Sequence, residues 1–257
     1  MVDNRSGRRF AVPASRRLTW DLLYFHRGVP LCSHDRRMVL KDLALAREGA
    51  GVRISWPALF LKAMARVSLE FPELRQIWYR WPWAHLYQHP GSVGVLTIQR
   101  EIAGEPWLFW GRIASPELKT LPEIQAMINR YQTETPAKVF GRDLRLAGLP
   151  LLLRRLIWWW NLNVETGSRA KRIGTFFLST LAGRGVEIQL PPSVQTTCLT
   201  YGPLDETGIS RVTLAYDHRI MDGARVAEIL ARLEAVLTTD ILNELRGLAK
   251  SGERVAA

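Results

Sequence analysis

The sequence has few cysteines, no long uninterrupted apolar run, and fewer acidic than basic residues. Its 257 residues include two cysteines, Cys32 and Cys198, and neither has a Cys/His cluster nearby. This argues against a zinc site or a disulfide framework and favours a reducing, cytoplasmic setting. The apolar stretch 149–160 is interrupted by Arg154 and Arg155, so we expect no membrane-spanning segment. Residues 1–9 are polar and basic and lack the apolar core of a signal peptide.

Basic residues outnumber acidic ones by 35 to 24, which gives a formal net charge of +11 and a sequence pI near 10.2. The positive electrostatic field of such a protein favours anionic partners: nucleic acid, anionic lipid, or a phosphate-bearing cofactor or carrier. The sequence has no helix-turn-helix, zinc-finger or RNA-binding signature, so we do not expect nucleic acid as a partner. A solvated basic surface that keeps the protein soluble is an equally good interpretation.

We expect one domain over residues 13–245, with a flexible basic arm at 1–12 and a flexible tail at 246–257. No repeat and no Pro/Ser/Gly-rich linker divides it, and 47% hydrophobic residues are ample for a buried core. Apolar spacing predicts helices over 15–27, 54–71, 115–131 and 147–160 and after Gly223. Strands are predicted over 91–99, 105–113, 174–181, 196–201 and 211–216. The fold class expected is therefore α/β, a sandwich of helices on a mixed β-sheet.

His218 is the main candidate for chemistry. It directly follows a predicted strand, and Asp222 and Gly223 follow at the start of the last predicted helix. A histidine with a pKa near 6.5 suits proton abstraction at neutral pH, and Asp222 is well placed to cap the helix. A His–Asp pair alone is weak support, and we expect surface or structural roles for the other four histidines.

The pattern His-x-x-x-Asp-Gly after a strand resembles the active-site motif of coenzyme-A-dependent acyltransferases of the chloramphenicol acetyltransferase type. The fuller string 213–224 looks most like the acyltransferase (E2) subunits of 2-oxoacid dehydrogenases, whose signature is Ser-Tyr-Asp-His-Arg-x-x-Asp-Gly-Ala. Residues 174–181 resemble that family's Gly-Thr-Phe-Thr-Ile-Ser-Asn-Leu. Further similar segments are 12–17, 54–74 and Pro191-Pro192. The resemblance thus covers nearly the whole chain.

The resemblance implies a chloramphenicol acetyltransferase-like two-layer sandwich and an acyl transfer by direct attack on a thioester. His218 would be the general base, Ser179 would donate a hydrogen bond to the oxyanion, and Asp222 would hold the site together by pairing with an arginine. Supporting residues would be Arg16 (or Arg17), Thr180, Arg219 and Gly223. It also implies a homotrimer, in which His218 of one chain faces Ser179 of its neighbour.

The resemblance further implies no metal and no tightly bound cofactor. The acyl donor would be acyl-CoA or an acyl carrier protein, both phosphopantetheine thioesters, and the acceptor a hydroxyl, amine or thiol. The 257 residues include no lipoyl domain, which favours a stand-alone enzyme. The alternatives are the core of a 2-oxoacid dehydrogenase-like complex served by lipoyl groups of a partner chain, and a catalytically silent scaffold.

Two segments combine tryptophan with arginine, 78–83 and 149–160. Tryptophan favours interfaces, and basic amphipathic stretches bind anionic membrane surfaces. One interpretation is that these tryptophans fill the core or a subunit contact. The other is an acyl tunnel or a peripheral membrane contact for a lipid-like acceptor.

Overall fold

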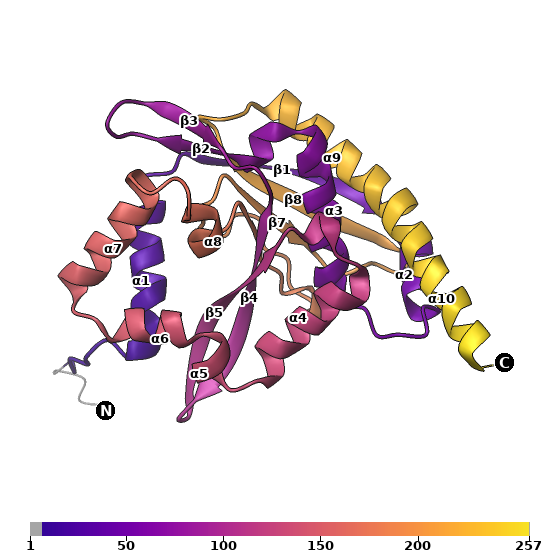
Figure 1. Cartoon of the computed structure of the whole chain (residues 1–257), viewed down its shortest axis with the longest axis horizontal. Helices are drawn as coiled ribbons and strands as arrows, with labels where there is room; N and C mark the ends of the chain where they lie inside the picture. The colour runs from indigo at the N-terminus through magenta and orange to yellow at the C-terminus, as the bar shows by residue number, and fades with distance from the viewer. Residues whose placement is uncertain (1–6, 257) are drawn as a thin grey trace, which may run out of the picture.

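A computed structural model describes the backbone of residues 7–256 and the side chains of residues 7–250. One six-stranded sheet runs through the molecule in the order β1-β8-β7-β6-β4-β5 (Figure 1). Its strands are β1 (Leu31–Val39), β4 (Val93–Ile102), β5 (Glu105–Ala114), β6 (Phe176–Leu178), β7 (Thr197–Tyr201) and β8 (Ile209–Asp217). Strand β6 is parallel to β4 and β7, and the other pairs are antiparallel. The sheet is therefore mixed, as predicted.

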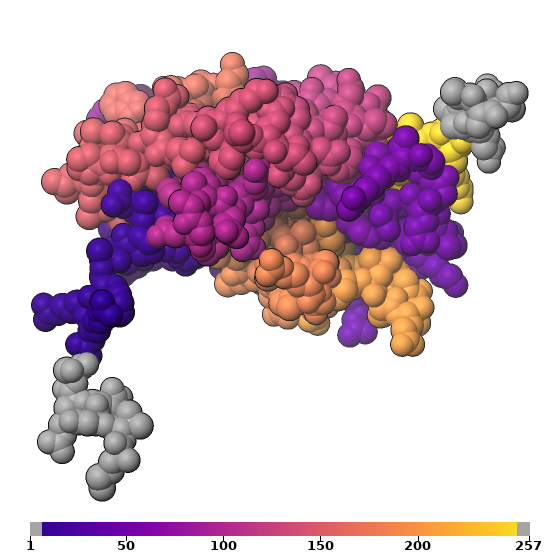
Figure 2. All heavy atoms as spheres, turned by 90° about the horizontal axis from the view of Figure 1, so that it is seen from below, coloured from indigo at the N-terminus to yellow at the C-terminus, as the bar shows by residue number. Residues whose placement is uncertain are grey.

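Helices cover both faces of this sheet (Figure 1). On the first face, which carries Phe176 and Leu178, lie α2 (Lys41–Glu48), α3 (Trp56–Glu70), α4 (Leu121–Thr133), α9 (Gly223–Val236) and α10 (Leu242–Ala256). On the second face, which carries Phe177, lie α1 (Ala14–His26), α6 (Gly141–Gly148), α7 (Leu151–Asn163) and α8 (Arg169–Ile173). The short helix α5 (Pro136–Val139) precedes α6. From below, the pink and red segments that hold α4 to α7 form one continuous band across the molecule (Figure 2).

The first face has a large apolar core. Helix α3 contributes most of one side, because its residues from Ala58 to Ala65 are all buried. The ring of Phe60 stacks on Tyr201 of β7 with centroids 4.2 Å apart. A buried ion pair joins α3 to α10, where Lys62 Nζ lies 2.5 Å from Glu244 Oε2. Burial of this apolar area is the main force that holds the helices on the sheet.

The second face has a smaller core that mixes tryptophan with charge. The buried tryptophans Trp110 and Trp158 meet edge to face, with centroids 6.2 Å apart. Asp21 of α1 is fully buried and accepts from Arg154 Nε at 2.6 Å and Arg155 Nε at 2.7 Å. These bonds tie α1 to α7, since a buried carboxylate needs cationic partners.

The predicted elements are largely present, with shifted ends. The helix predicted over 115–131 begins only at Leu121, because Thr120 and Glu123 form a capping box that fixes its start. In the predicted helical stretch 147–160, α7 starts after Pro150, which has no N–H to continue a helix. The strand predicted over 174–181 shrinks to three residues in β6.

The elements that were not predicted are β1, the separate hairpin of β2 (Gln76–Tyr79) and β3 (His85–Gln88), and the helices α2, α5, α8 and most of α6. The predicted domain end at residue 245 falls inside α10, which continues to Ala256. Residues 1–6 of the predicted basic arm lie outside the described residues.

Between α9 and α10 the helix makes a π-turn over Leu237–Ile241 and then continues. Leu237, Ile241 and Leu245 are all buried on the first face. The three segments form one long rod along the sheet (Figure 1).

Within the described part of the chain, no helix combines the length and apolar character needed to cross a membrane. The tryptophans of the two Trp/Arg segments differ in exposure. Trp158 is buried, whereas Trp81, Trp83 and Trp160 are at least half exposed.

Candidate active site

His218 stands at the end of β8, where the neighbouring backbone fixes its position. The N–H of Asp217 donates to Thr196 O at 2.9 Å, and the N–H of His218 donates to Pro30 O at 3.1 Å. The imidazole is 43% exposed, and its Nδ1 lies 3.4 Å from Asp222 Oδ1. The ring is thus held on one side and open on the other, as a general base requires.

Asp222 is the N-cap residue of α9, but its side chain caps nothing and is 85% exposed. Gly223 follows, and a Cβ added to it would lie 3.1 Å from the His34 ring, a tight contact that would require this ring to shift. His34 stacks on Tyr216 with centroids 5.5 Å apart, and Tyr216 is equally close to His218. Three rings therefore line up beneath the start of α9.

Among the residues that the structure describes, no arginine pairs with Asp222. Arg219 instead pairs with Asp217, two residues before it. Its Nε donates to Asp217 Oδ1 at 2.8 Å and its Nη2 to Oδ2 at 2.5 Å. Its guanidinium also lies 4.2 Å from the centroid of the Trp78 ring. This bidentate pairing suits the planar guanidinium and fixes the turn that carries His218. Arg17 donates to Ala147 O, on the second face.

Ser179 directly follows β6, and its N–H donates to Leu199 O at 3.1 Å. The side chain is nearly buried, with 9% of the residue exposed. Thr180 fixes the turn after it: its hydroxyl donates to Tyr201 O at 3.0 Å and accepts from Ala182 N at 3.1 Å. Ser179 therefore sits in a rigid turn, as an oxyanion donor would need to.

Ser179 and His218 lie at opposite ends of the sheet. Phe176, Thr197 and Tyr216 are level across β6, β7 and β8. Ser179 is three residues past this level in one direction, and His218 is two residues past it in the other, because β8 is antiparallel to β7. Five residues along the strands and two strands across amount to about 19 Å. One chain alone therefore does not bring the two side chains together.

Arg16 lies at the Ser179 end of the sheet. It lines a shallow hollow with Gln99 and Trp107. Gln99 is three residues past Leu96, the residue of β4 that pairs with Leu178. Arg16 is thus far from Asp222 of its own chain but near the level of Ser179.

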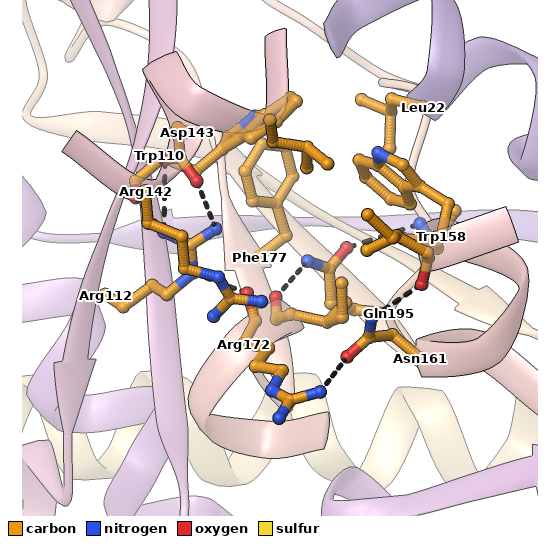
Figure 3. Close-up of a pocket in the computed structure, with 14 residues that line it drawn as sticks. Leu22, Trp110, Arg112, Arg142, Asp143, Trp158, Asn161, Arg172, Phe177 and Gln195 are labelled. Atoms are coloured by element: carbon orange, nitrogen blue, oxygen red, sulfur yellow. Dashed lines mark hydrogen bonds and ion pairs between the residues drawn. The ribbon is translucent and has the colours of Figure 1, made fainter. Parts of the chain in front are cut away.

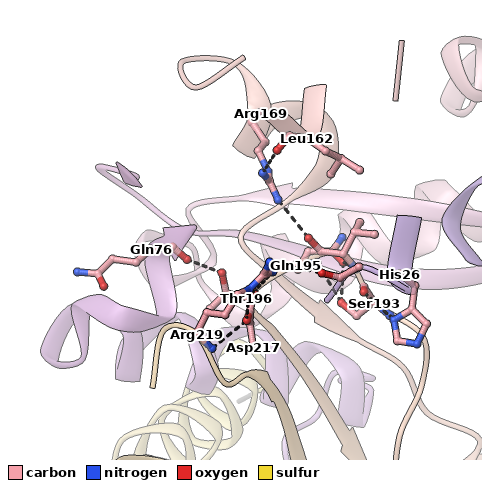
Figure 4. A network of polar contacts seen from close by, with 11 residues as sticks. His26, Gln76, Leu162, Arg169, Ser193, Gln195, Thr196, Asp217 and Arg219 are labelled. Atoms are coloured by element: carbon pink, nitrogen blue, oxygen red, sulfur yellow. Dashed lines mark hydrogen bonds and ion pairs between the residues drawn. The ribbon is translucent and has the colours of Figure 1, made fainter. Parts of the chain in front are cut away.

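A basic hollow adjoins His218 through Asp217 and Arg219, which line it. Figure 4 shows both residues with Arg169, which is buried and donates to Leu162 O and Val194 O. Burial and the nearby Arg219 lower the pKa of Arg169 below its usual range. Trp78 and Trp159 supply apolar walls. An anionic group with an apolar neighbour would fit such a lining.

No group of three or more His, Cys, Asp or Glu side chains able to hold a metal ion occurs in the described residues. The two cysteines are free thiols, and burial raises the pKa of Cys198 well above its usual value. Sequence reasoning missed the roles of His34, Asp217 and Arg169. The Asp217–Arg219 spacing within the motif was the one local signal for such a contact, because the others depend on distant segments.

No protein-family model matches the chain, and no curated protein does either. Among solved structures, the catalytic core of a 2-oxoacid dehydrogenase multienzyme complex from Thermoplasma acidophilum is 14% identical, with a TM-score of 0.65 over 91% of this chain and 99% of that one. A probable dihydrolipoamide acetyltransferase from Listeria monocytogenes is 16% identical, with a TM-score of 0.62 over 91% and 95%.

Dihydrolipoamide acetyltransferase from Azotobacter vinelandii is 20% identical, with a TM-score of 0.61 over 95% of this chain and 98% of that one. Identities at this level report on fold alone. The predicted fold is confirmed: the chain has the α/β fold of the catalytic cores of 2-oxoacid dehydrogenase acyltransferases.

Proposed function

We propose that the protein is an acyltransferase in which His218 is the general base. The observation that carries the proposal is the placement of this imidazole: fixed through its backbone and Asp222, and open on the other side. In the A. vinelandii neighbour, a serine, a histidine and an asparagine four residues after that histidine have been investigated for their roles in catalysis. Asp222 stands four residues after His218 here.

In the proposed reaction, His218 Nε2 takes the proton of the acceptor hydroxyl, amine or thiol. The acceptor attacks the thioester carbonyl, and the Ser179 hydroxyl donates to the oxyanion that forms. The intermediate then collapses with loss of the C–S bond, and the leaving thiolate receives the proton from His218. Asp222 keeps Nδ1 oriented, so that Nε2 stays free for this transfer.

The distance of about 19 Å within one chain supports a site shared between subunits of a homotrimer. His218 would then face Ser179 of the next chain. In that arrangement Arg16, which lies at the Ser179 end, would approach the partner subunit's Asp222 and supply the arginine that the chain's own Asp222 lacks. The high exposure of Asp222 agrees with a partner from outside the chain.

The basic hollow beside His218 supports an acyl donor that carries phosphate, acyl-CoA or an acyl carrier protein, as a substrate and not as a resident cofactor. The apolar surface of α7 supports a lipid-like acceptor or a peripheral membrane contact, because Leu152 is 84% and Leu156 58% exposed. A cytoplasmic setting fits such donors.

The first experiment measures thiol release from a panel of acyl-CoAs and acyl carrier proteins, with dihydrolipoamide among the acceptors. We expect His218→Ala to lower the rate by about 10²–10⁴-fold and Ser179→Ala by about 10²-fold or more. His85→Ala, in the β2–β3 hairpin, is the matched control and should keep the rate. If His218→Ala released thiol as fast as the unaltered protein, the proposed base would be wrong.

The second experiment tests the shared site by mixing chains with His218→Ala and chains with Ser179→Ala. Each is inactive alone, but a mixed trimer has sites that take His218 from one chain and Ser179 from the other. Random 1:1 assembly should restore about a quarter of the activity. A monomer by light scattering, or no recovery in mixed trimers, would contradict the shared site and leave the proposed base standing.

A further inference from the structure

A second hollow lies on the second face of the sheet, enclosed by α1, α6, α7 and α8 (Figure 3). The hollow is narrow and partly open, and the figure of about 590 Å³ for the space free of atoms includes the solvent in front of it. Its walls are apolar side chains from six elements and the loop before β7: Leu22, Trp110, Leu146, Ile157, Trp158, Ile173, Phe177 and Val194. His218, Asp222 and Ser179 do not line it. Apolar walls of this kind favour a ligand with a hydrocarbon part.

Three arginines from three different elements converge on the same hollow (Figure 3). Arg112 is anchored, because its Nε donates to Arg172 O at 2.6 Å and its Nη atoms lie 3.3 Å from the carboxylate of Asp143. Arg172 is anchored through Nη1, which donates to Asn161 Oδ1 at 2.8 Å. Asp143 therefore offsets one of three positive charges, which leaves an excess of cation at this point.

Arg142 is the cation without an anchor. It makes no hydrogen bond or ion pair with the part of the chain that the structure describes. Partial burial and the charges of Arg112 and Arg172 lower the pKa of Arg142 below its ordinary value, and Asp143 opposes this shift only in part. An anion placed here would relieve the repulsion and give Arg142 a bidentate partner.

The lining also holds an unused donor. Trp158 is buried, and its indole Nε1 has no acceptor among the described residues. The amide groups of the lining are already used: Gln195 donates to Ile173 O at 2.7 Å, and Asn161 donates to Ile157 O at 2.6 Å. A buried N–H without an acceptor is costly, so a ligand oxygen within reach would be stabilised.

We propose that this hollow binds a fatty carboxylate. The hydrocarbon chain lies against Trp110, Trp158 and Phe177, and the carboxylate binds Arg142 between Arg112 and Arg172. A carboxylate on an alkyl chain matches one cationic end and one apolar wall. The inference goes beyond the proposed acyl transfer, because none of the three proposed catalytic side chains takes part.

The test uses the full chain and decanoate, below its micelle concentration, in isothermal titration calorimetry and tryptophan fluorescence. Decanoate should bind and change the emission of Trp110 and Trp158. Decanol, with the same chain and no charge, should bind at least about tenfold more weakly, and acetate should not bind at all. Equal binding of decanoate and decanol, or no binding of decanoate at millimolar concentration, would overturn the proposal.

Arg142→Gln is the decisive variant, because Arg142 is exposed at the rim and its loss leaves no buried group unpaired. It should weaken decanoate about tenfold or more and leave decanol and the melting temperature unchanged. The exposed Arg53 serves as the matched control, and Arg53→Gln should bind decanoate like the unaltered protein. His218→Ala should also bind decanoate normally, which separates this site from the proposed active site. Unchanged decanoate affinity in Arg142→Gln would refute the arginine end of the site.

Discussion

The two faces of the sheet are built on different principles. The first face is covered by five helices whose buried side chains are almost all aliphatic or phenylalanine, and it packs as one continuous core. The second face has fewer buried apolar residues, includes the buried tryptophans, and holds the Asp21–Arg154 pair and the arginine-lined hollow. The difference indicates that the first face contributes most of the buried apolar area that stabilises the fold. The second face buries charged groups and contains the hollow in which we propose that a ligand binds.

The sharpest comparison of the two faces uses neighbouring residues of β6. Phe176 points into the first core and Phe177 borders the hollow on the second face. Phe176→Ala should lower the free energy of unfolding by about 3–5 kcal/mol. Phe177→Ala should cost at least about 1 kcal/mol less, because a side chain beside a void has fewer contacts to lose. Urea unfolding of both variants measures this, and equal losses would mean that the two faces pack alike.

A smaller effect should appear on acidification. His89 is buried beside Arg169, and burial together with that arginine lowers its pKa from 6.5 to about 4. Between these values the unfolded chain binds a proton that the folded chain does not, so stability falls as pH falls. The loss from pH 6.5 to 4 should be on the order of 3 kcal/mol from this group.

His89→Phe keeps a ring beside Tyr87 and removes the titration. Its unfolding free energy should therefore depend less steeply on pH in this window. If the unfolding free energies of the unaltered protein and of His89→Phe depended equally on pH, groups other than His89 would determine the pH dependence of stability.

The smallest effect expected concerns how the helices begin. On the first face α4 starts with a capping box, whereas α1 and α7 on the second face start at Pro13 and Pro150 without a side-chain cap. Thr120→Ala should lower the free energy of unfolding by about 1 kcal/mol. Thr133→Ala, near the end of the same helix, is the control and should change little. If Thr120→Ala and Thr133→Ala unfolded at the same urea concentration, the capping box would not contribute to the stability of the protein.

The sequence predicted helices of both faces, α3, α4 and α9 on the first and α1 and α7 on the second. Periodic apolar residues revealed α3 and α9, and alternation revealed β4 and β5, because the apolar side chains of these elements are buried in the core. Strand β1 was missed because Ser33 to Arg37 are exposed and polar, and the strand exists through its pairing with β8. No local sequence pattern predicts that Arg112, Arg142 and Arg172 line the same hollow, because only tertiary folding brings them together.

The residues of the proposed site could be predicted from the sequence, but their positions relative to one another could not. Family resemblance pointed to Ser179 and His218, but only the strand register showed that they stand at opposite ends of one chain. Of the arginines considered as partners of Asp222, Arg219 pairs instead with Asp217, two residues before it in the same turn.

The π-turn between α9 and α10 has a consequence for how the sequence can vary. One extra residue per turn rotates everything that follows by about 100° around the helix axis. This rotation lets Leu242 and Leu245 reach the core after α9 has used its own apolar stripe. The alignment of α10 therefore depends on a residue count and not on any side chain at the turn. Substitutions at Thr238 or Thr239 should be tolerated, whereas deleting one of them would rotate α10 by about 100° and turn Leu242 and Leu245 away from the core.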